Sequence, residues 1–253
     1  MRFALLGSGS RGNAALICAG RTRVLLDCGL GLAEARRRLS RLGVEASELD
    51  GILVTHEHDD HLGGVGPLTR RFGLPVWMTP GTFSVWRNPV PERVRMINPH
   101  EAFAIDDLLI QPYPVPHDAR EPCQFVFSDG RLRLGVLSDA GSVTVHMRST
   151  LDVCDGLLLE FNHDPELLAA GPYPESLKRR VGGAYGHLSN TQAASLLQSV
   201  DCSRLQHLVL THLSETNNTP KRALDAARSA QCCDPNLIVC ADQSVGLDWR
   251  QLA

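Results

Sequence analysis

The sequence lacks several features that mark particular classes of protein. Its eight cysteines form no Cys-x-x-Cys pair, which argues against a zinc ribbon and against a disulfide framework. No apolar run approaches the length needed to cross a bilayer, and a Gly/Ser-rich stretch follows the first apolar residues too soon for a signal peptide. We therefore expect a cytoplasmic protein with reduced cysteines and no membrane partner.

An excess of positive charge is also lacking. The chain has 25 Lys and Arg against 28 Asp and Glu, which gives a formal net charge of −3 at pH 7. Contact with nucleic acid must then depend on local basic patches, such as Arg36–Arg38 and Lys178–Arg180. The Ser8–Asn13 loop lacks the Gly-Lys-Ser/Thr ending of a Walker phosphate-binding loop. We interpret it as a tight turn, although its backbone N–H groups could also face an anion.

The composition is otherwise that of an ordinary globular protein, with 43% hydrophobic and 21% charged residues. Because the chain has no linker, repeat or low-complexity stretch, residues 1–253 are predicted to form a single domain. Three short apolar runs separated by turn residues predict an antiparallel meander at Phe3–Leu6, Ala14–Ala19 and Arg23–Cys28. The helical spacing of residues 32–42 predicts the first helix.

The densest group of metal-ligating side chains lies between His56 and His61, where three imidazoles and three carboxylates follow one another. The group follows the apolar run 51–54, a predicted buried strand, and leads into a helix expected to reach about Arg71. On an extended backbone His56 and His58 point to the same side. Nitrogen and oxygen ligands this close together favour one or two divalent transition metals over a polar loop with scattered histidines.

The same pattern recurs along the chain, because several apolar strands are followed at once by a histidine or a carboxylate. Any one of these residues alone is more simply a cap or a satisfied polar group. Sites in α/β proteins collect at strand ends, however, so together the residues are predicted to converge. They are Asp27, His56, His58, His117, Asp139, Glu160 and His212.

The motif His56-x-His58-x-Asp60-His61, followed along the chain by His117, Asp139 and His212, resembles in type and order the metal ligands of the metallo-β-lactamase superfamily, over nearly the whole chain. The resemblance implies an α/β fold, the αββα metallo-β-lactamase-fold sandwich of two mixed β-sheets flanked by helices. It also implies two divalent metal ions, zinc first and manganese or iron as alternatives. The first metal would take His56, His58 and His117, the second would take Asp60, His61 and His212, and Asp139 would bridge them.

Longer stretches resemble the YycJ/WalJ-like nuclease group within that superfamily. The matching stretches are Gly7–Asn13, Thr55–His61, His117–Ala119, Glu160–Asp164, Gly186–Asn190 and His212–Ser214. This resemblance implies phosphodiester hydrolysis, with 5′-to-3′ exonuclease action on DNA as the leading expectation. The segment between Asp139 and His212 is too short for a β-CASP cassette, and no long exosite arm of the tRNA-processing enzymes is present. DNA is therefore favoured over RNA as the substrate.

The same resemblance suggests catalytic roles near the metals. His187, on a glycine-flanked loop, is the candidate general acid, with Glu160 orienting or charging it and Asp60 belonging to the reacting centre. His163 is an alternative acid, and His187 could instead be an ordinary residue at a helix start. Three other functions stay open: a hydrolase of thioesters, lactones or β-lactams, an RNA-processing endonuclease of the tRNA 3′-processing type, and a metal-stabilised binding protein.

Overall fold

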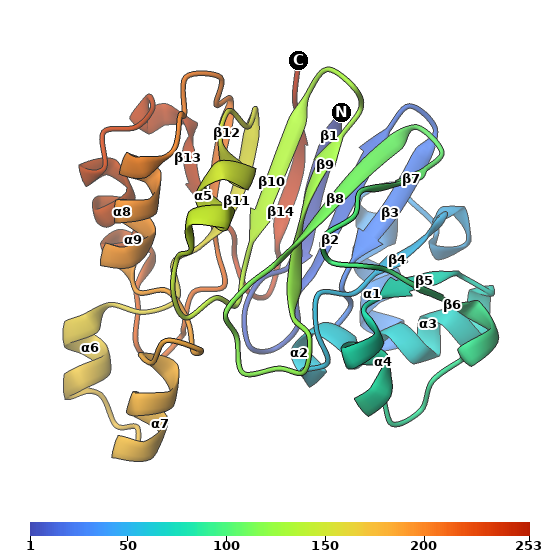
Figure 1. The fold of residues 1–253 in the computed structure, drawn as a ribbon, viewed down its shortest axis with the longest axis horizontal. Helices are drawn as coiled ribbons and strands as arrows, with labels where there is room; N and C mark the ends of the chain where they lie inside the picture. The colour runs from blue at the N-terminus through green and yellow to red at the C-terminus, as the bar shows by residue number, and fades with distance from the viewer.

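The structure is a computed structural model that describes residues 1–253, and it places two β-sheets face to face between two layers of helices (Figure 1). The first sheet has the strand order β14-β1-β2-β3-β4-β5-β6 and the second has the order β13-β12-β11-β10-β9-β8-β7. The first sheet consists of β14 (Leu247–Gln251), β1 (Arg2–Gly7), β2 (Ala14–Ala19), β3 (Thr22–Leu26), β4 (Gly51–Leu53), β5 (Val76–Met78) and β6 (Val94–Met96). The second consists of β13 (Ile238–Cys240), β12 (His207–Thr211), β11 (Gly156–Glu160), β10 (Arg133–Leu137), β9 (Cys123–Ser128), β8 (Leu108–Pro114) and β7 (Phe103–Ile105). The predicted αββα sandwich is confirmed.

Helices cover the outer face of each sheet. Those beside the first sheet are α1 (Leu32–Arg41), α2 (Asp59–Leu62), α3 (Val65–Phe72) and α4 (Pro80–Val85). Those beside the second sheet are α5 (Val145–Leu151), α8 (Asn190–Ser199) and α9 (Pro220–Ser229), while α6 (Pro165–Ala170) and α7 (Glu175–Val181) project beyond the sheet at the lower left of Figure 1. Short 3₁₀ turns lie at η1 (Ala46–Glu48), η2 (Pro91–Arg93) and η3 (Pro235–Leu237).

Both sheets are mixed. The pairs from β14 to β3 are antiparallel and those from β3 to β6 are parallel, and the second sheet changes in the same way at β10. The parallel strands β4, β10, β11 and β12 are apolar and almost wholly buried, as expected of strands covered on both faces. Since neighbouring parallel strands end at one edge, the residues that follow them are brought close together.

The core consists of three apolar layers, one between the sheets and one under each set of helices. Alternation along the strands divides the side chains between them. In β1, Phe3 and Leu5 enter the layer between the sheets, while Ala4 and Leu6 enter the layer beneath α1. Burial on both faces fixes the register of the strands, because a slip by one residue would exchange the two sets. The positions of the strand ends are fixed with it.

The early elements agree with the sequence, and one later helix does not. The antiparallel meander is confirmed, and α1 ends one residue before the predicted limit. The helix expected to reach Arg71 is divided into α2 and α3 by Gly63 and Gly64. At Gly64 a Cβ would lie 1.9 Å from the carbonyl oxygen of Leu30, so the backbones meet where only glycine fits. This contact holds the α2 turn against the chain that follows β3.

None of the helices has both the length and the apolar character that spanning a membrane requires.

Candidate metal centre

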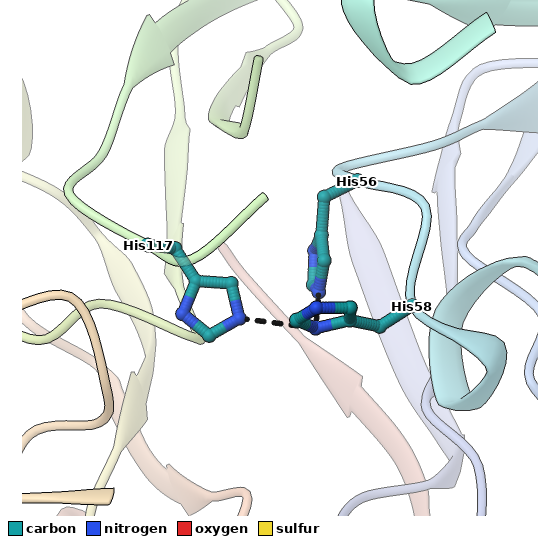
Figure 2. Close-up of side chains that lie close together, drawn as sticks. All are labelled: His56, His58 and His117. Atoms are coloured by element: carbon teal, nitrogen blue, oxygen red, sulfur yellow. Dashed lines mark hydrogen bonds between the residues drawn. The ribbon is translucent and has the colours of Figure 1, made fainter. Parts of the chain in front are cut away.

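Three imidazoles from two separate loops converge beyond the ends of the strands (Figure 2). Nδ1 of His58 lies 3.0 Å from Nε2 of His56 and 3.2 Å from Nε2 of His117. Two nitrogen ligands at roughly 2.0–2.1 Å from a tetrahedral zinc ion lie about 3.3 Å apart, so this separation fits a shared cation. His56 follows β4, His58 precedes α2, and His117 lies in the loop between β8 and β9.

Polar contacts on the far side of the His117 and His58 rings orient these nitrogens. Nδ1–H of His117 donates to the carbonyl of Gly186 at 3.0 Å, which leaves Nε2 as the free lone pair. Nε2 of His58 lies 3.8 Å from Oδ1 of Asp118. Burial, with the neighbouring His61, lowers the pKa of His56 well below its usual range, so its ring is neutral. A neutral imidazole is the form that binds a metal.

A second group lies beside the first and is richer in carboxylates. Oδ2 of Asp60 lies 3.7 Å from Nε2 of His61 and 3.6 Å from Nε2 of His212. Asp139 stands between the groups, with Oδ2 2.9 Å from Nε2 of His61 and Oδ1 4.0 Å from Nε2 of His117. Mixed imidazole and carboxylate donors suit zinc, manganese or iron. The residues present therefore fit two divalent cations with Asp139 between them.

Asp27 forms hydrogen bonds that orient a histidine of the second group. Its Oδ1 accepts the backbone N–H of Thr55 at 2.8 Å, and its Oδ2 lies 2.9 Å from the Thr55 hydroxyl and 2.8 Å from Nδ1 of His61. Nδ1–H of His61 thus points at a buried carboxylate, and its Nε2 faces the centre. The Thr55 hydroxyl also contacts Nδ1 of His56 at 3.0 Å, so one carboxylate orients a ring in each group.

Three of the residues at strand ends have left-handed backbone conformations. Asp27, Asp139 and His212 have φ values of 57°, 51° and 53°. Such a conformation costs about 1–3 kcal/mol at a residue other than glycine and persists only where its surroundings enforce it. Each of these residues turns the chain out of a strand and directs its side chain toward the metal groups. Three other residues, Asp106, Val153 and Gln231, share this conformation away from the site, so the conformation aims these three side chains but does not by itself mark function.

Glu160 and His187 form a pair at the edge of the second group. Glu160 ends β11, is wholly buried, and accepts the backbone N–H groups of Ala140 and Leu188 at 3.1 and 3.2 Å. Its Oε1 lies 2.8 Å from Nδ1 of His187 and 3.2 Å from Nδ1 of His212. Burial alone would raise the pKa of Glu160, but the charge and hydrogen bond of His187 outweigh it and lower the pKa to about 2.

The surroundings of His187 hold its ring and shift its pKa. Burial disfavours its charged form, but the carboxylates of Glu160 and Asp139 outweigh this and raise the pKa of His187. Nδ1 is engaged by Glu160, Nε2 has no protein partner, and 22% of the side chain is exposed. His163, the alternative acid, lines a different cavity beneath α6 and α7, and burial lowers its pKa to about 4. His163 thus lies outside the cavity that His187 lines.

A cavity of about 380 Å³ opens over the two groups. Its floor includes His58, Asp60, Asp139, His187 and His212. One wall is the projecting helix α7 with the segment before it, which contributes Tyr173, Leu177 and Arg180. Nε of Arg180 donates to Oδ2 of Asp118 at 2.5 Å and ties this wall to the His117 loop. Lys178–Arg180, one of the two predicted basic patches, thus places one guanidinium over the metal groups.

Sequence reasoning missed several supporting residues. Nδ2 of Asn13 lies 2.9 Å from Nε2 of His61 and 3.3 Å from Oδ2 of Asp60, and Oγ of Ser8 accepts the backbone N–H of His212 at 2.8 Å. The Ser8–Asn13 loop is a tight turn, as predicted, with a hydrogen bond from the Gly12 N–H to the Gly9 carbonyl. It also bridges the two sheets at the site. The Gly7-Ser8-x-x-x-Gly12-Asn13 pattern was the only signal available for it.

Comparison with known families agrees with this geometry. The model of the β-lactamase superfamily domain matches residues 22–213, so the chain belongs to that superfamily. Within it the chain belongs with the YycJ/WalJ proteins. It is 31% identical over 227 residues to the exodeoxyribonuclease YycJ of Bacillus anthracis, covering 88% of this chain and 86% of that protein. It is 30% identical over 255 residues to the exodeoxyribonuclease WalJ of Streptococcus pneumoniae, covering 98% of this chain and 92% of that protein.

A solved structure shows the same fold over the full chain. The metallo-β-lactamase fold protein YhfI of Bacillus subtilis superimposes with a TM-score of 0.76 at 16% identity, and the match covers 99% of each chain. The fold, the family and the clustered histidines and carboxylates together define a metal-dependent hydrolase that binds divalent cations.

Proposed function

We propose that this protein is a two-metal phosphodiesterase that degrades DNA from the 5′ end, and that residues 1–253 act as one hydrolase domain. The observation that carries the proposal is the Glu160–His187 pair, at 2.8 Å, beside two groups of metal-ligating side chains. Hydrolysis of a phosphodiester expels a poorly stabilised alkoxide, so the reaction needs a proton donor next to the metals. The named activity of YycJ and WalJ, exodeoxyribonuclease, supports the same reading.

The ligand assignment is part of the proposal. His56, His58 and His117 would hold one cation, Asp60, His61 and His212 would hold the other, and Asp139 would contact both. When bound, the two cations would neutralise the phosphoryl oxygens and lower the pKa of an attacking water. Zinc is the first expectation for this donor set, with manganese or iron as alternatives.

The chain itself would supply the leaving-group chemistry. The carboxylates of Glu160 and Asp139 outweigh burial and raise the pKa of His187, which favours its protonated ring, and Nε2–H would donate to the departing O3′ as the P–O3′ bond breaks. Glu160 would hold Nδ1–H, fix the ring orientation and stabilise its charge. Water would supply the oxygen of the new P–O bond, which leaves a 5′-phosphate on the remaining strand.

The experiment is a substrate panel at matched enzyme concentration with Zn²⁺ or Mn²⁺. It contains single-stranded DNA, duplex DNA and RNA, each labelled at either end, together with nitrocefin and a thioester. We expect DNA to be shortened from the 5′ end, with loss of activity in Asp139→Asn. Faster cleavage of RNA than of DNA would identify RNA as the substrate. If the thioester or nitrocefin is hydrolysed and nucleic acid is not, the protein would be a small-molecule hydrolase and not a phosphodiesterase.

A further inference from the structure

A second cavity of about 550 Å³ adjoins the first, and nothing in the proposed chemistry uses it. The two cavities share His58 and Asp59, so the second begins where the first metal group ends. Its walls come from α2 and α3, from the segment after α4, and from the loop between β8 and β9. A polymer bound across the metal centre would continue into it past His58.

The cavity is lined by three arginines that form no ion pair. Arg70, Arg87 and Arg120 are exposed, and the only side-chain hydrogen bond among them runs from Arg70 to the carbonyl of Asn88 at 3.2 Å. Arg180 in the first cavity, by contrast, is already paired with Asp118. Unpaired guanidinium groups present several N–H donors in a geometry that matches a phosphate.

Two carboxylates in the same walls offset part of this charge. Glu57 accepts the backbone N–H of Arg120 at 2.8 Å, so it serves to hold the loop that carries the arginine. Asp59 lies at the boundary with the metal centre, where bound cations would dominate the local field. The part of the cavity away from the metals therefore keeps a positive wall.

An aromatic side chain completes the wall. Trp86, the residue that follows α4, packs partly against the apolar layer of the first sheet and also lines the cavity. Val85 beside it is 37% exposed. Aromatic faces that accept bases, next to arginines that contact the backbone, are the features by which proteins hold single-stranded nucleic acid.

We infer that this second cavity binds the strand that remains after cleavage, as an unpaired single strand, with Arg70, Arg87 and Arg120 on its phosphates and Trp86 stacked on a base. The inference rests on the proposed function for its direction. His187 lines only the first cavity, so the nucleotide whose O3′ it protonates lies there. The phosphate and the chain attached to it then extend past His58.

The test measures binding separately from turnover. A fluorescent phosphorothioate single strand of eight nucleotides is titrated by anisotropy against the wild type, the triple variant Arg70→Gln/Arg87→Gln/Arg120→Gln, and Arg71→Gln. Arg71 is the matched control, since it neighbours Arg70 on α3, is exposed, and does not line the cavity. Melting temperatures establish that each variant is folded.

We expect the triple variant to bind the eight-mer at least tenfold more weakly than the wild type does. Arg71→Gln should change the affinity for the eight-mer less than twofold. Each phosphate contact adds about 0.7 to the slope of log Kd against log salt for a single strand, so the triple variant should lose about 2 from that slope. Trp86→Leu should weaken binding by roughly tenfold and Trp86→Phe by less, because only phenylalanine keeps a face for stacking. A dinucleotide should distinguish these variants far less than the eight-mer does.

Equal affinity and equal salt slope in the wild type and the triple variant would overturn the inference, as would equal losses in the triple variant and Arg71→Gln. The proposed function is decided by a different readout, the hydrolysis of bis(p-nitrophenyl) phosphate and of DNA by the wild type. If the wild type degrades DNA while the triple variant binds the eight-mer normally, only the inferred role of the second cavity would be overturned. A wild type that cleaves no phosphodiester would overturn the proposed function.

Discussion

Nδ1 of His187 lies 2.8 Å from Oε1 of Glu160, and this carboxylate is completely buried while the imidazole is partly exposed. The contact fixes which ring nitrogen faces inward. It leaves Nε2 as the only nitrogen of His187 that a substrate could meet. The pair thereby connects the buried end of β11 to the cavity above the metal groups.

Removal of the His187 ring should reduce turnover without removing the metals. We expect His187→Ala to lower kcat for DNA by about 10²–10⁴-fold, because general acid catalysis contributes that much. The metal content, measured by elemental analysis of the purified variant, should stay near that of the wild type. His187 also lies in a group with Asp139, Glu160 and His212 whose ligand atoms are within 4.8 Å of one another. Loss of a metal ion in His187→Ala would therefore make this residue a ligand.

The pH dependence of kcat should report the same pair. The pKa of His187 is raised in the folded protein, so its proton is present below that pKa and is lost as the pH rises through it. Activity should then fall on the alkaline side. Glu160→Gln removes the negative charge that raises this pKa, so the alkaline limb should move to lower pH. An alkaline limb at the same pH in both proteins would assign it to another group.

Asp27 should matter for metal affinity although it touches no substrate. Asp27→Asn weakens the hydrogen bond that orients His61, and the loss of such a partner typically reduces metal affinity about 10–100-fold. We expect the affinity for the second cation to fall and the first to be affected less, as measured by competition with a chelating dye.

Asp50→Asn is the matched control for this experiment. Asp50 also accepts a backbone N–H beside β3, that of Arg23 at 2.7 Å, but lies outside the metal groups. It should affect stability and leave both metal affinities unchanged. Equal metal loss in the two variants would show that general destabilisation, and not the orientation of His61, is the cause.

The polar residues at strand ends were predictable from the sequence because most of them follow an apolar run that reads as a buried strand. Parallel pairing of β10, β11 and β12 then brings Asp139, Glu160 and His212 together, as the fold requires. The contact of Asn13 with His61 was not predictable, since it depends on how the turn after β1 packs against α2. Strand β14 was also missed, because its half-buried residues show little apolar pattern before they pair with β1.

The second cavity also could not be predicted from the sequence, because its lining residues come from separate segments. Arg70 lies on α3, Trp86 follows α4, and Arg120 belongs to the loop between β8 and β9. In the sequence, each of these residues is most simply explained as an ordinary surface or core residue, and no motif links them. Only the packing of three separate segments makes them one wall.

Gly29 provides a test of how closely the metal groups depend on backbone packing. A Cβ at this position would lie 2.0 Å from the carbonyl oxygen of Asp60, an atom that also accepts the N–H of Asn13 at 2.7 Å. Gly29→Ala must therefore push the α2 turn away from the chain after β3. We expect the free energy of unfolding to fall by about 2–3 kcal/mol, the upper part of the range for single substitutions.

The displaced atom belongs to a proposed ligand of the second cation. Gly29→Ala should therefore also lower the affinity for the second cation more than the affinity for the first. Gly31→Ala is the control two residues away, because a Cβ there meets nothing within 4 Å. It should leave the melting temperature and both metal affinities close to those of the wild type. A Gly29→Ala protein with wild-type metal affinity would mean that Asp60 is free to shift without consequence, and that its carboxylate does not hold the second cation.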